Sequence, residues 1–133
     1  MKLLTLAACF ASLGFGQSPA CDSLENCREA LKLNPRYAEA HFRIGEIYLS
    51  EGNAGDQDAY RRAMNEFRMS IASSLTPIWI VGWAHINMGK IWDVLHNRDR
   101  ALNEYRLALR TKDNTNGALD AATKYSEVPY SPN

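Results

Sequence analysis

The 133-residue sequence has no excess of charge of either sign and few cysteines. Fifteen Lys and Arg balance fifteen Asp and Glu, so the chain lacks the positive field with which proteins hold nucleic acids. Three cysteines are too few for a scaffold held together by disulfides. We expect no nucleic-acid partner, and 46% hydrophobic with 23% charged residues indicates one globular domain of ordinary size.

Motifs of catalysis and of cofactor or metal binding are also missing. The sequence contains no Gly-x-Ser-x-Gly, no phosphate-binding loop and no dinucleotide fingerprint. Its three histidines, His41, His85 and His96, form no His-x-x-x-His pair and no cluster with cysteines. We therefore expect no enzyme activity, no cofactor and no metal, and interpret the histidines as structural. An enzyme with an unrecognised site stays open as a remote alternative.

The N-terminus carries the pattern of a targeting segment. Lys2 precedes the apolar run 3–13, and glycines lie one and three positions before a cut after Gly16. This pattern is typical of a secretory signal peptide, and it is shorter than the roughly 20 apolar residues of a membrane span. We expect no transmembrane segment and export of residues 17–133 to the periplasm or the medium. Lipid attachment at Cys9 and a buried N-terminal helix are the less favoured alternatives.

Two cysteines, Cys21 and Cys27, remain in the exported part, where an oxidising compartment would allow them to pair. On one helix, two residues six positions apart have Cα atoms about 9 Å apart, which is beyond disulfide reach. The bridge becomes possible if Cys21 precedes the helix. The sequence leaves the question open.

Helical signals dominate the rest of the chain, and sustained apolar-polar alternation is absent. We expect Asp22 and Thr76 to cap the first and fourth helices and Gly52-Asn53 to stop the second. Short connections make consecutive helices antiparallel. The expected helices cover about residues 22–33, 38–50, 58–74, 77–95, 98–111 and 117–125.

One motif occurs twice. His41-x-x-Ile44-Gly45-x-x-Tyr48 recurs as His85-x-x-Met88-Gly89-x-x-Trp92, and each is followed by Ala-x-x-x-aromatic, first Ala63 to Phe67 and then Ala101 to Tyr105. The glycine and the alanine are 12 residues apart in the second copy and 18 apart in the first. We expect the six extra residues around 54–59. The motif resembles the tetratricopeptide repeat, a helical hairpin of 34 residues.

This resemblance covers about residues 22–125 and implies an all-α fold. The fold would be a right-handed solenoid of antiparallel helical hairpins, with about two and a half repeats and a C-terminal capping helix. Residues 1–16 would be the signal peptide, 17–21 an N-terminal extension and 126–133 a tail. Small residues would let the helices approach closely and aromatic residues would fill the space between them. The packing residues would be Gly45, Tyr48, Ala63, Phe67, Gly89, Trp92, Ala101 and Tyr105.

In the family that the chain resembles, the first helices of successive repeats line a concave groove. The resemblance therefore implies a non-catalytic scaffold that binds a peptide or a protein partner in this groove. Residues at three- and four-residue spacings would share the inner helix face. They are Glu39, Phe42, Glu46 and Leu49 in one repeat and Trp83, Ile86, Lys90 and Asp93 in the next. Self-association into an envelope structure is the alternative, since so few repeats leave their ends uncovered.

Four bulky apolar residues follow one another at 78–81, with the sequence Ile-Trp-Ile-Val. Successive helix residues turn by about 100°, so these side chains cannot all face one side. We expect the run to be buried within the chain. Exposure as an interface is the alternative.

Overall fold

The computed structural model describes residues 21–133, and the regular structure in this part of the chain is entirely helical. The helices are α1 (Leu24–Leu33), α2 (Ala38–Asn53), α3 (Gln57–Ser70), α4 (Ile78–Val94), α5 (Arg98–Arg110) and α6 (Ala118–Glu127), with a 3-10 turn at Thr115–Gly117. The expected all-α class is confirmed for these residues. None of their helices is long and apolar enough to cross a membrane. The predicted signal peptide and Cys9 lie outside the described residues.

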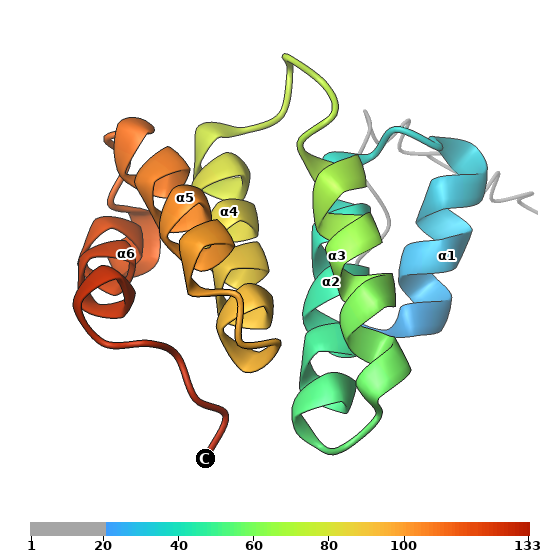
Figure 1. Ribbon diagram of the computed structural model, residues 1–133. Helices are drawn as coiled ribbons and strands as arrows, with labels where there is room; N and C mark the ends of the chain where they lie inside the picture. Colours follow the sequence, from blue (N-terminus) through green and yellow to red (C-terminus); the bar gives the residue numbers. More distant parts are fainter. Residues whose placement is uncertain (1–20) are drawn as a thin grey trace, which may run out of the picture.

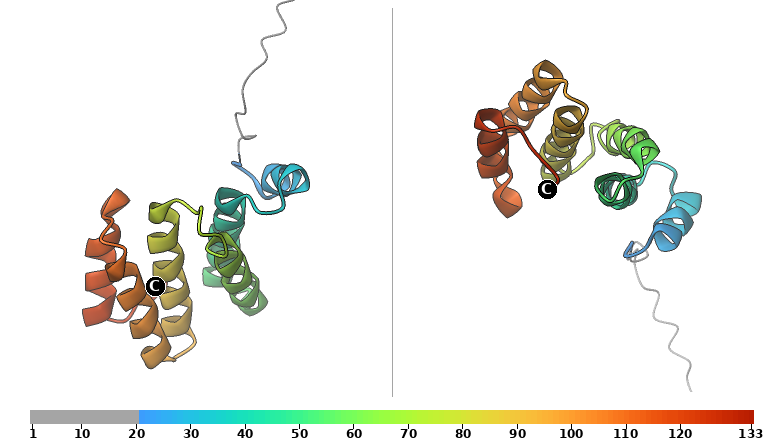
Figure 2. Two further views of the ribbon diagram at one scale, coloured as in Figure 1. Left: turned by 90° about the horizontal axis from the view of Figure 1, so that it is seen from above. Right: turned by 60° about the horizontal axis from the view of Figure 1, so that its bottom comes forward.

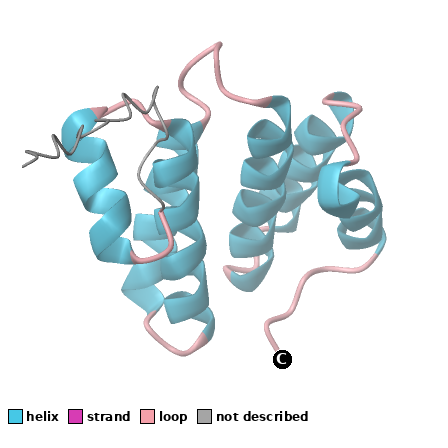
Figure 3. Ribbon diagram, turned by 180° about the vertical axis from the view of Figure 1, so that it is seen from behind, coloured by secondary structure: helices cyan, strands magenta, loops and turns pink. Residues whose placement is uncertain are grey.

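Consecutive helices pack against each other, most extensively α2 on α3 and α4 on α5 (Figure 1). The helices α2, α4 and α6 are neighbours on one side of the molecule, and α3 and α5 cover the other side (Figure 2). The helix α1 packs on α2 at one end. After α6 the chain turns back toward α4 as an extended tail (Figure 3). The face formed by α2, α4 and α6 is the one on which the sequence placed a groove.

The six extra residues of the first hairpin lengthen two helices rather than a loop. The helix α2 runs eight residues past Gly45, whereas α4 runs five past Gly89. The helix α3 begins six residues before Ala63, whereas α5 begins three before Ala101. Three residues connect the helices in both hairpins. The insertion expected around 54–59 is therefore divided between the end of α2 and the start of α3.

The apolar run at 78–81 is an extra first turn of α4. This helix begins 11 residues before its repeat glycine, and α2 begins seven before the equivalent glycine. Ile80 is fully buried, and the Trp79 ring packs edge-on against Phe42 with their centroids 5.6 Å apart. Ile78 is 50% exposed. The expected burial thus holds fully for Ile80, in part for Trp79 and Val81, and not for Ile78.

The ends of two helices differ from the expectation. Ser23 rather than Asp22 caps α1, because its hydroxyl accepts a hydrogen bond from the Asn26 N–H while the Asp22 carboxylate binds the Asn26 side chain. Thr76 does not cap α4; its hydroxyl donates to the Ser70 carbonyl oxygen at 2.8 Å. That bond satisfies the carbonyl of Ser70, the last residue of α3. The helix thus ends four residues before the expected end at residue 74.

Both repeat glycines lie under an aromatic ring of the following helix. A Cβ atom at Gly45 would lie 2.7 Å from Cε1 of Phe67, and one at Gly89 would lie 2.4 Å from Cε1 of Tyr105. Real Cβ atoms do not approach carbon atoms this closely, so a larger residue would displace the ring. The group that requires glycine is thus the ring, not the backbone of the partner helix.

A third glycine, which the repeated motif does not include, has the same role. A Cβ atom at Gly52 would lie 2.6 Å from Tyr60. Gly52 follows Gly45 by seven residues and Tyr60 precedes Phe67 by seven, as the antiparallel pairing of α2 with α3 requires. The Tyr60 hydroxyl also donates to Oδ1 of Asn53 at 3.0 Å. Gly52 and Asn53 are therefore the last two residues of α2, which runs three residues past the expected end at residue 50.

The remaining packing residues divide by depth. Ala63, Phe67, Ala101 and Tyr105 are fully buried. Tyr48 and Trp92 are only partly buried, each with an arginine over its ring: Arg62 lies 5.7 Å and Arg100 4.6 Å from the respective ring centroid. Each ring nevertheless packs against two apolar clusters, Tyr48 against those of α1 and of the first hairpin and Trp92 against those of the first and second hairpins, so both rings lie between neighbouring units as expected.

The structure answers the question about the cysteines. Cys21 and Cys27 form a disulfide, with their Cα atoms 4.6 Å apart. Cys21 precedes α1, which is the arrangement that the bridge requires. Cys27 is buried between α1 and α2 with Ala30 and Ile44. The bridge thus fastens the chain before α1 to the smallest of the apolar clusters.

Two glycines on α4 provide a matched test of the ring contact. We predict that Gly89→Ala lowers the free energy of unfolding by about 1–3 kcal/mol, the usual range for overpacking. Gly82→Ala should be neutral or stabilising by up to about 1 kcal/mol, because its Cβ would meet Thr111 at 3.5 Å and alanine favours the helix. Denaturant unfolding measures both values. Equal effects of the two substitutions would contradict the assigned role of the ring.

Candidate functional site

The two repeated histidines each face a glutamate of the next helix. The Nδ1 atom of His41 lies 2.7 Å from Oε2 of Glu66, and Nδ1 of His85 lies 2.7 Å from Oε2 of Glu104. Each glutamate follows the repeat alanine by three residues. Each histidine therefore joins the two helices of its hairpin at an equivalent position. In the described part of the chain, no group of three or more His, Cys, Asp or Glu side chains could hold a metal ion.

The face formed by α2, α4 and α6 divides the expected groove residues into two sets. Glu39, Glu46, Trp83 and Lys90 are partly exposed, whereas Phe42, Leu49, Ile86 and Asp93 are buried. This corrects the expectation that all eight side chains lie open in the groove: Leu49 and Ile86 are core residues, Phe42 exposes only 2% of its surface, and the chain's own tail covers Asp93. The reason is that neighbouring helices flank both α2 and α4.

A hollow lies between α2 and α4 on this face. Its lining consists of Phe42, Arg43, Glu46, Trp79, Trp83 and Asn116. Nη1 of Arg43 donates to Oε2 of Glu46 at 2.8 Å, and both side chains remain about 40% exposed. Nε1 of Trp83 donates to the Thr115 carbonyl oxygen at 2.9 Å, which fixes the orientation of the indole. The hollow thus combines the side chains of Trp79 and Trp83 with two charges of opposite sign.

Three of these lining residues were not expected from the sequence. Arg43 directly follows an expected groove residue and completes the surface between α2 and α4. Trp79 reaches the hollow because α4 has an extra first turn. Asn116 comes from the turn before α6, which no repeat motif covers. The length of α4 could have revealed Trp79, but nothing in the sequence relates Asn116 to α2.

The ammonium group of Lys90 lies among three aromatic rings. Its Nζ atom is 5.9 Å from the ring centroid of Trp83, 5.4 Å from that of Tyr125 and 5.1 Å from that of Tyr130. Burial lowers the pKa of Lys90 below its ordinary 10.5, while the negative charge of Glu46 acts in the opposite direction. Aromatic faces attract a cation at these distances. The three rings thereby keep the Lys90 side chain on the face formed by α2, α4 and α6.

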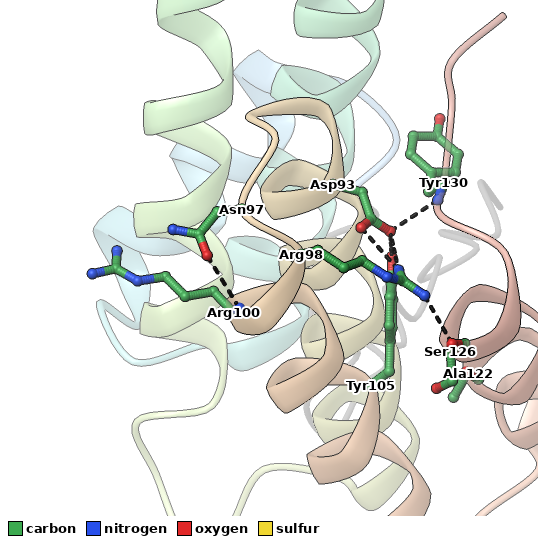
Figure 4. A network of polar contacts seen from close by, with 8 residues as sticks. All are labelled: Asp93, Asn97, Arg98, Arg100, Tyr105, Ala122, Ser126 and Tyr130. Atoms are coloured by element: carbon green, nitrogen blue, oxygen red, sulfur yellow. Dashed lines mark hydrogen bonds and ion pairs between the residues drawn. The ribbon is translucent and has the colours of Figure 1, made fainter.

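A buried carboxylate joins α4, α5 and the tail (Figure 4). Asp93 accepts from Nη1 of Arg98 at 2.9 and 3.0 Å, from the Tyr105 hydroxyl at 2.7 Å and from the Tyr130 N–H at 2.8 Å. Nη2 of Arg98 also donates to the Ser126 carbonyl oxygen at the end of α6. Burial, and then the bond to Asp93, raises the pKa of Tyr105 well above its ordinary 10. Asp93 is therefore a structural junction and not an open groove residue.

Comparison with protein-family models, with curated proteins and with solved structures finds no significant match to this chain. What can be inferred about the face formed by α2, α4 and α6 therefore comes from its own geometry. That geometry combines a fixed indole, a lysine among aromatic rings and an exposed Arg-Glu pair. It contains surface suited to contact with a polypeptide, and aromatic and arginine side chains are enriched where proteins bind each other.

The His41 pair gives a pH-dependent prediction. Both ring nitrogens face acceptors, Glu66 and the Pro35 carbonyl oxygen, so the hydrogen bond to Glu66 raises the pKa of His41 above its ordinary 6.5 although burial opposes it. The pair stabilises the fold fully below about pH 6.5 and loses its effect as the pH rises through the raised pKa.

We predict that Glu66→Gln lowers the His41 pKa in an NMR titration. Its cost in the free energy of unfolding should be larger at pH 6 than at pH 9. A His41 pKa at or below 6.5 in the wild type would contradict this account.

The Asp93 junction gives a stability prediction. Asp93→Ala leaves the Arg98 and Tyr105 donors without their acceptor and should lower the free energy of unfolding by about 3 kcal/mol. The control is Asp99→Ala in the exposed first turn of α5, where loss of the helix-dipole interaction should cost at most about 1 kcal/mol. Urea denaturation measures both. Similar values for the two variants would show that the junction contributes little.

Proposed function

We propose that this chain is an exported, non-catalytic scaffold of the tetratricopeptide-repeat type that binds a peptide or protein segment on the face of α2, α4 and α6. The observation that carries the proposal is the hollow beside Trp79 and Trp83, with Arg43 and Glu46 at its rim. Two helical hairpins with matching glycine-aromatic contacts support the repeat architecture. The repeated His-Glu pairs support it too, since they lie at equivalent positions.

The chemistry of the face fits a polypeptide better than a small molecule. The hollow is open to solvent between two helices, and the charged side chains of Arg43 and Glu46, each about 40% exposed, line it. Small-molecule sites are typically enclosed, largely apolar clefts. An extended or helical segment could instead place an apolar side chain against Trp79 and Trp83 and pair its charges with Arg43 and Glu46. We infer a partner segment with at least one aromatic or aliphatic anchor.

The test is selection of peptides from a random phage-displayed library on the wild-type chain. We predict that the selected peptides bind Glu46→Arg at least about tenfold more weakly, because the substitution places like charges together at the rim. The matched control is Glu29→Arg on α1, whose 58% exposed side chain lies on a helix that does not line the hollow. Binding measured by calorimetry should be unchanged in this control. Enriched peptides that bind both variants equally would place recognition on another surface.

Self-association is a second candidate function, and exposed apolar side chains favour it. Leu33 is 80% exposed at the end of α1, and Leu75 is 90% exposed in the connection before α4. The connection from α1 to α2, which follows Leu33, and the connection from α3 to α4, which contains Leu75, lie at the same end of the molecule (Figure 1). Residues of the two connections line one common hollow there. Light scattering over a range of concentrations separates this function from that of a monomeric scaffold, because a mass that rises with concentration requires self-association.

A further inference from the structure

The C-terminal tail lies across the face that we propose as the binding site. After α6 ends at Glu127, the chain turns back over α4 toward α2 (Figures 2 and 3). Val128 is 62% exposed, and residues 131–133 are exposed as well. Tyr130, between these exposed stretches, is partly buried. The tail is therefore attached to the face mainly through this one residue.

Tyr130 is held through its backbone, its ring and its hydroxyl. Its N–H donates to the buried Asp93 carboxylate at 2.8 Å. Its ring lies 5.1 Å from Nζ of Lys90 and edge-on to Tyr125, with a centroid distance of 5.4 Å. Its hydroxyl accepts from Nδ2 of Asn53, at the end of α2, at 3.0 Å. These contacts fix the direction, the ring and the end of one tyrosine residue in an extended segment.

We propose that Lys90, Asp93, Tyr125 and Asn53 form a binding subsite for a tyrosine in an extended peptide, and that the chain's own Tyr130 fills this subsite until a partner segment displaces it. The inference rests on the proposed function and adds to it the chemistry of the partner. The partner carries a tyrosine with a free backbone N–H. This N–H would donate to Asp93 in place of the N–H of Tyr130.

The attachment of the tail is suited to exchange. Prolines at 129 and 132 flank the anchor and favour extended backbone, so the segment loses little conformational freedom on docking. A short tether gives the tail an effective concentration in the millimolar range. If the docked form outnumbers the free form about tenfold, a competing ligand binds about tenfold more weakly, because its apparent Kd is the intrinsic Kd divided by the free fraction.

The neighbouring hollow extends the same site. Trp83 lines the hollow and also faces Lys90, whose other neighbours include Tyr130. The hollow itself contains no residue of the tail among its lining side chains. A longer partner segment could therefore occupy the hollow and the tyrosine subsite together. The tail fills only the second, which leaves the first open as a starting point for displacement.

The experiment uses the full chain and a fluorescent peptide with the sequence of residues 127–133, Glu-Val-Pro-Tyr-Ser-Pro-Asn. We expect the Tyr130→Ala chain to bind this peptide at least about tenfold more tightly than the wild type does, as measured by fluorescence anisotropy. The matched control is Ser131→Ala, an exposed tail position, which should behave as the wild type. A peptide with alanine in place of its tyrosine should not bind. Equal affinity of the wild type and Tyr130→Ala, or no binding to either, would overturn the inference.

A second measurement reports on the docked tail without any ligand. In the wild type, the aromatic rings around Lys90 should shift its ε-methylene protons upfield in the NMR spectrum. Tyr130→Ala should reduce this shift and Tyr130→Phe should largely keep it, since phenylalanine retains the ring and loses only the bond to Asn53. Circular dichroism verifies that both variants stay helical. A Lys90 shift that is the same in the wild type and in Tyr130→Ala would overturn the docking of the tail.

The two experiments distinguish a failure of the tyrosine subsite from a failure of the proposed scaffold function. Library peptides that lose affinity for Glu46→Arg, but bind the wild type and Tyr130→Ala equally, would support the scaffold and overturn the tyrosine subsite. Binding of the tail peptide to Tyr130→Ala, without any library peptide that responds to Glu46→Arg, would support the subsite and contradict the wider groove.

Discussion

The contact between a glycine and an aromatic ring sets the geometry on which the rest of this fold depends. Gly45 accepts Phe67 and Gly89 accepts Tyr105, with no space for even a methyl group between them. The two helices of each hairpin are thus held at one separation and in one register. That register brings each repeated histidine opposite a glutamate. It also places α2 beside α4 on the face that these helices form with α6.

Much of this arrangement could be predicted from local pattern. The repeat of His, Gly and aromatic residues identified the helices that pair, and the different spacing from Gly45 to Ala63 showed that one hairpin differs from the other. The sequence placed the extra residues around 54–59 but did not show that they are divided between the two helices. They lengthen α2 and α3, and in the added turns Gly52 admits Tyr60 in the same way as Gly45 admits Phe67, a relation that is visible only once the helices are paired.

The site was harder to predict because its decisive contacts join distant parts of the chain. Asp93 and Tyr130 are 37 residues apart, and Asn53 and Tyr130 are 77 apart. No periodicity relates such positions, and the tail has no repeat motif. Helical spacing correctly placed Lys90 on the common face but also placed Asp93 there, since spacing gives the direction of a side chain from its own helix and not the elements that cover it. A buried carboxylate with four hydrogen bonds links the fold to the tail that crosses the site.

The most direct test of this account is an NMR titration of the isotope-labelled full chain with a peptide selected from the library. The account predicts that backbone amide shifts change along α2, α4 and α6. It also predicts that the amide signals of Tyr130, Ser131 and Asn133 sharpen and move to the positions of a free chain as Tyr130 leaves Asp93. Shift changes confined to α1, α3 or α5, with the tail amides unmoved, would contradict both the binding face and its occupation by the tail.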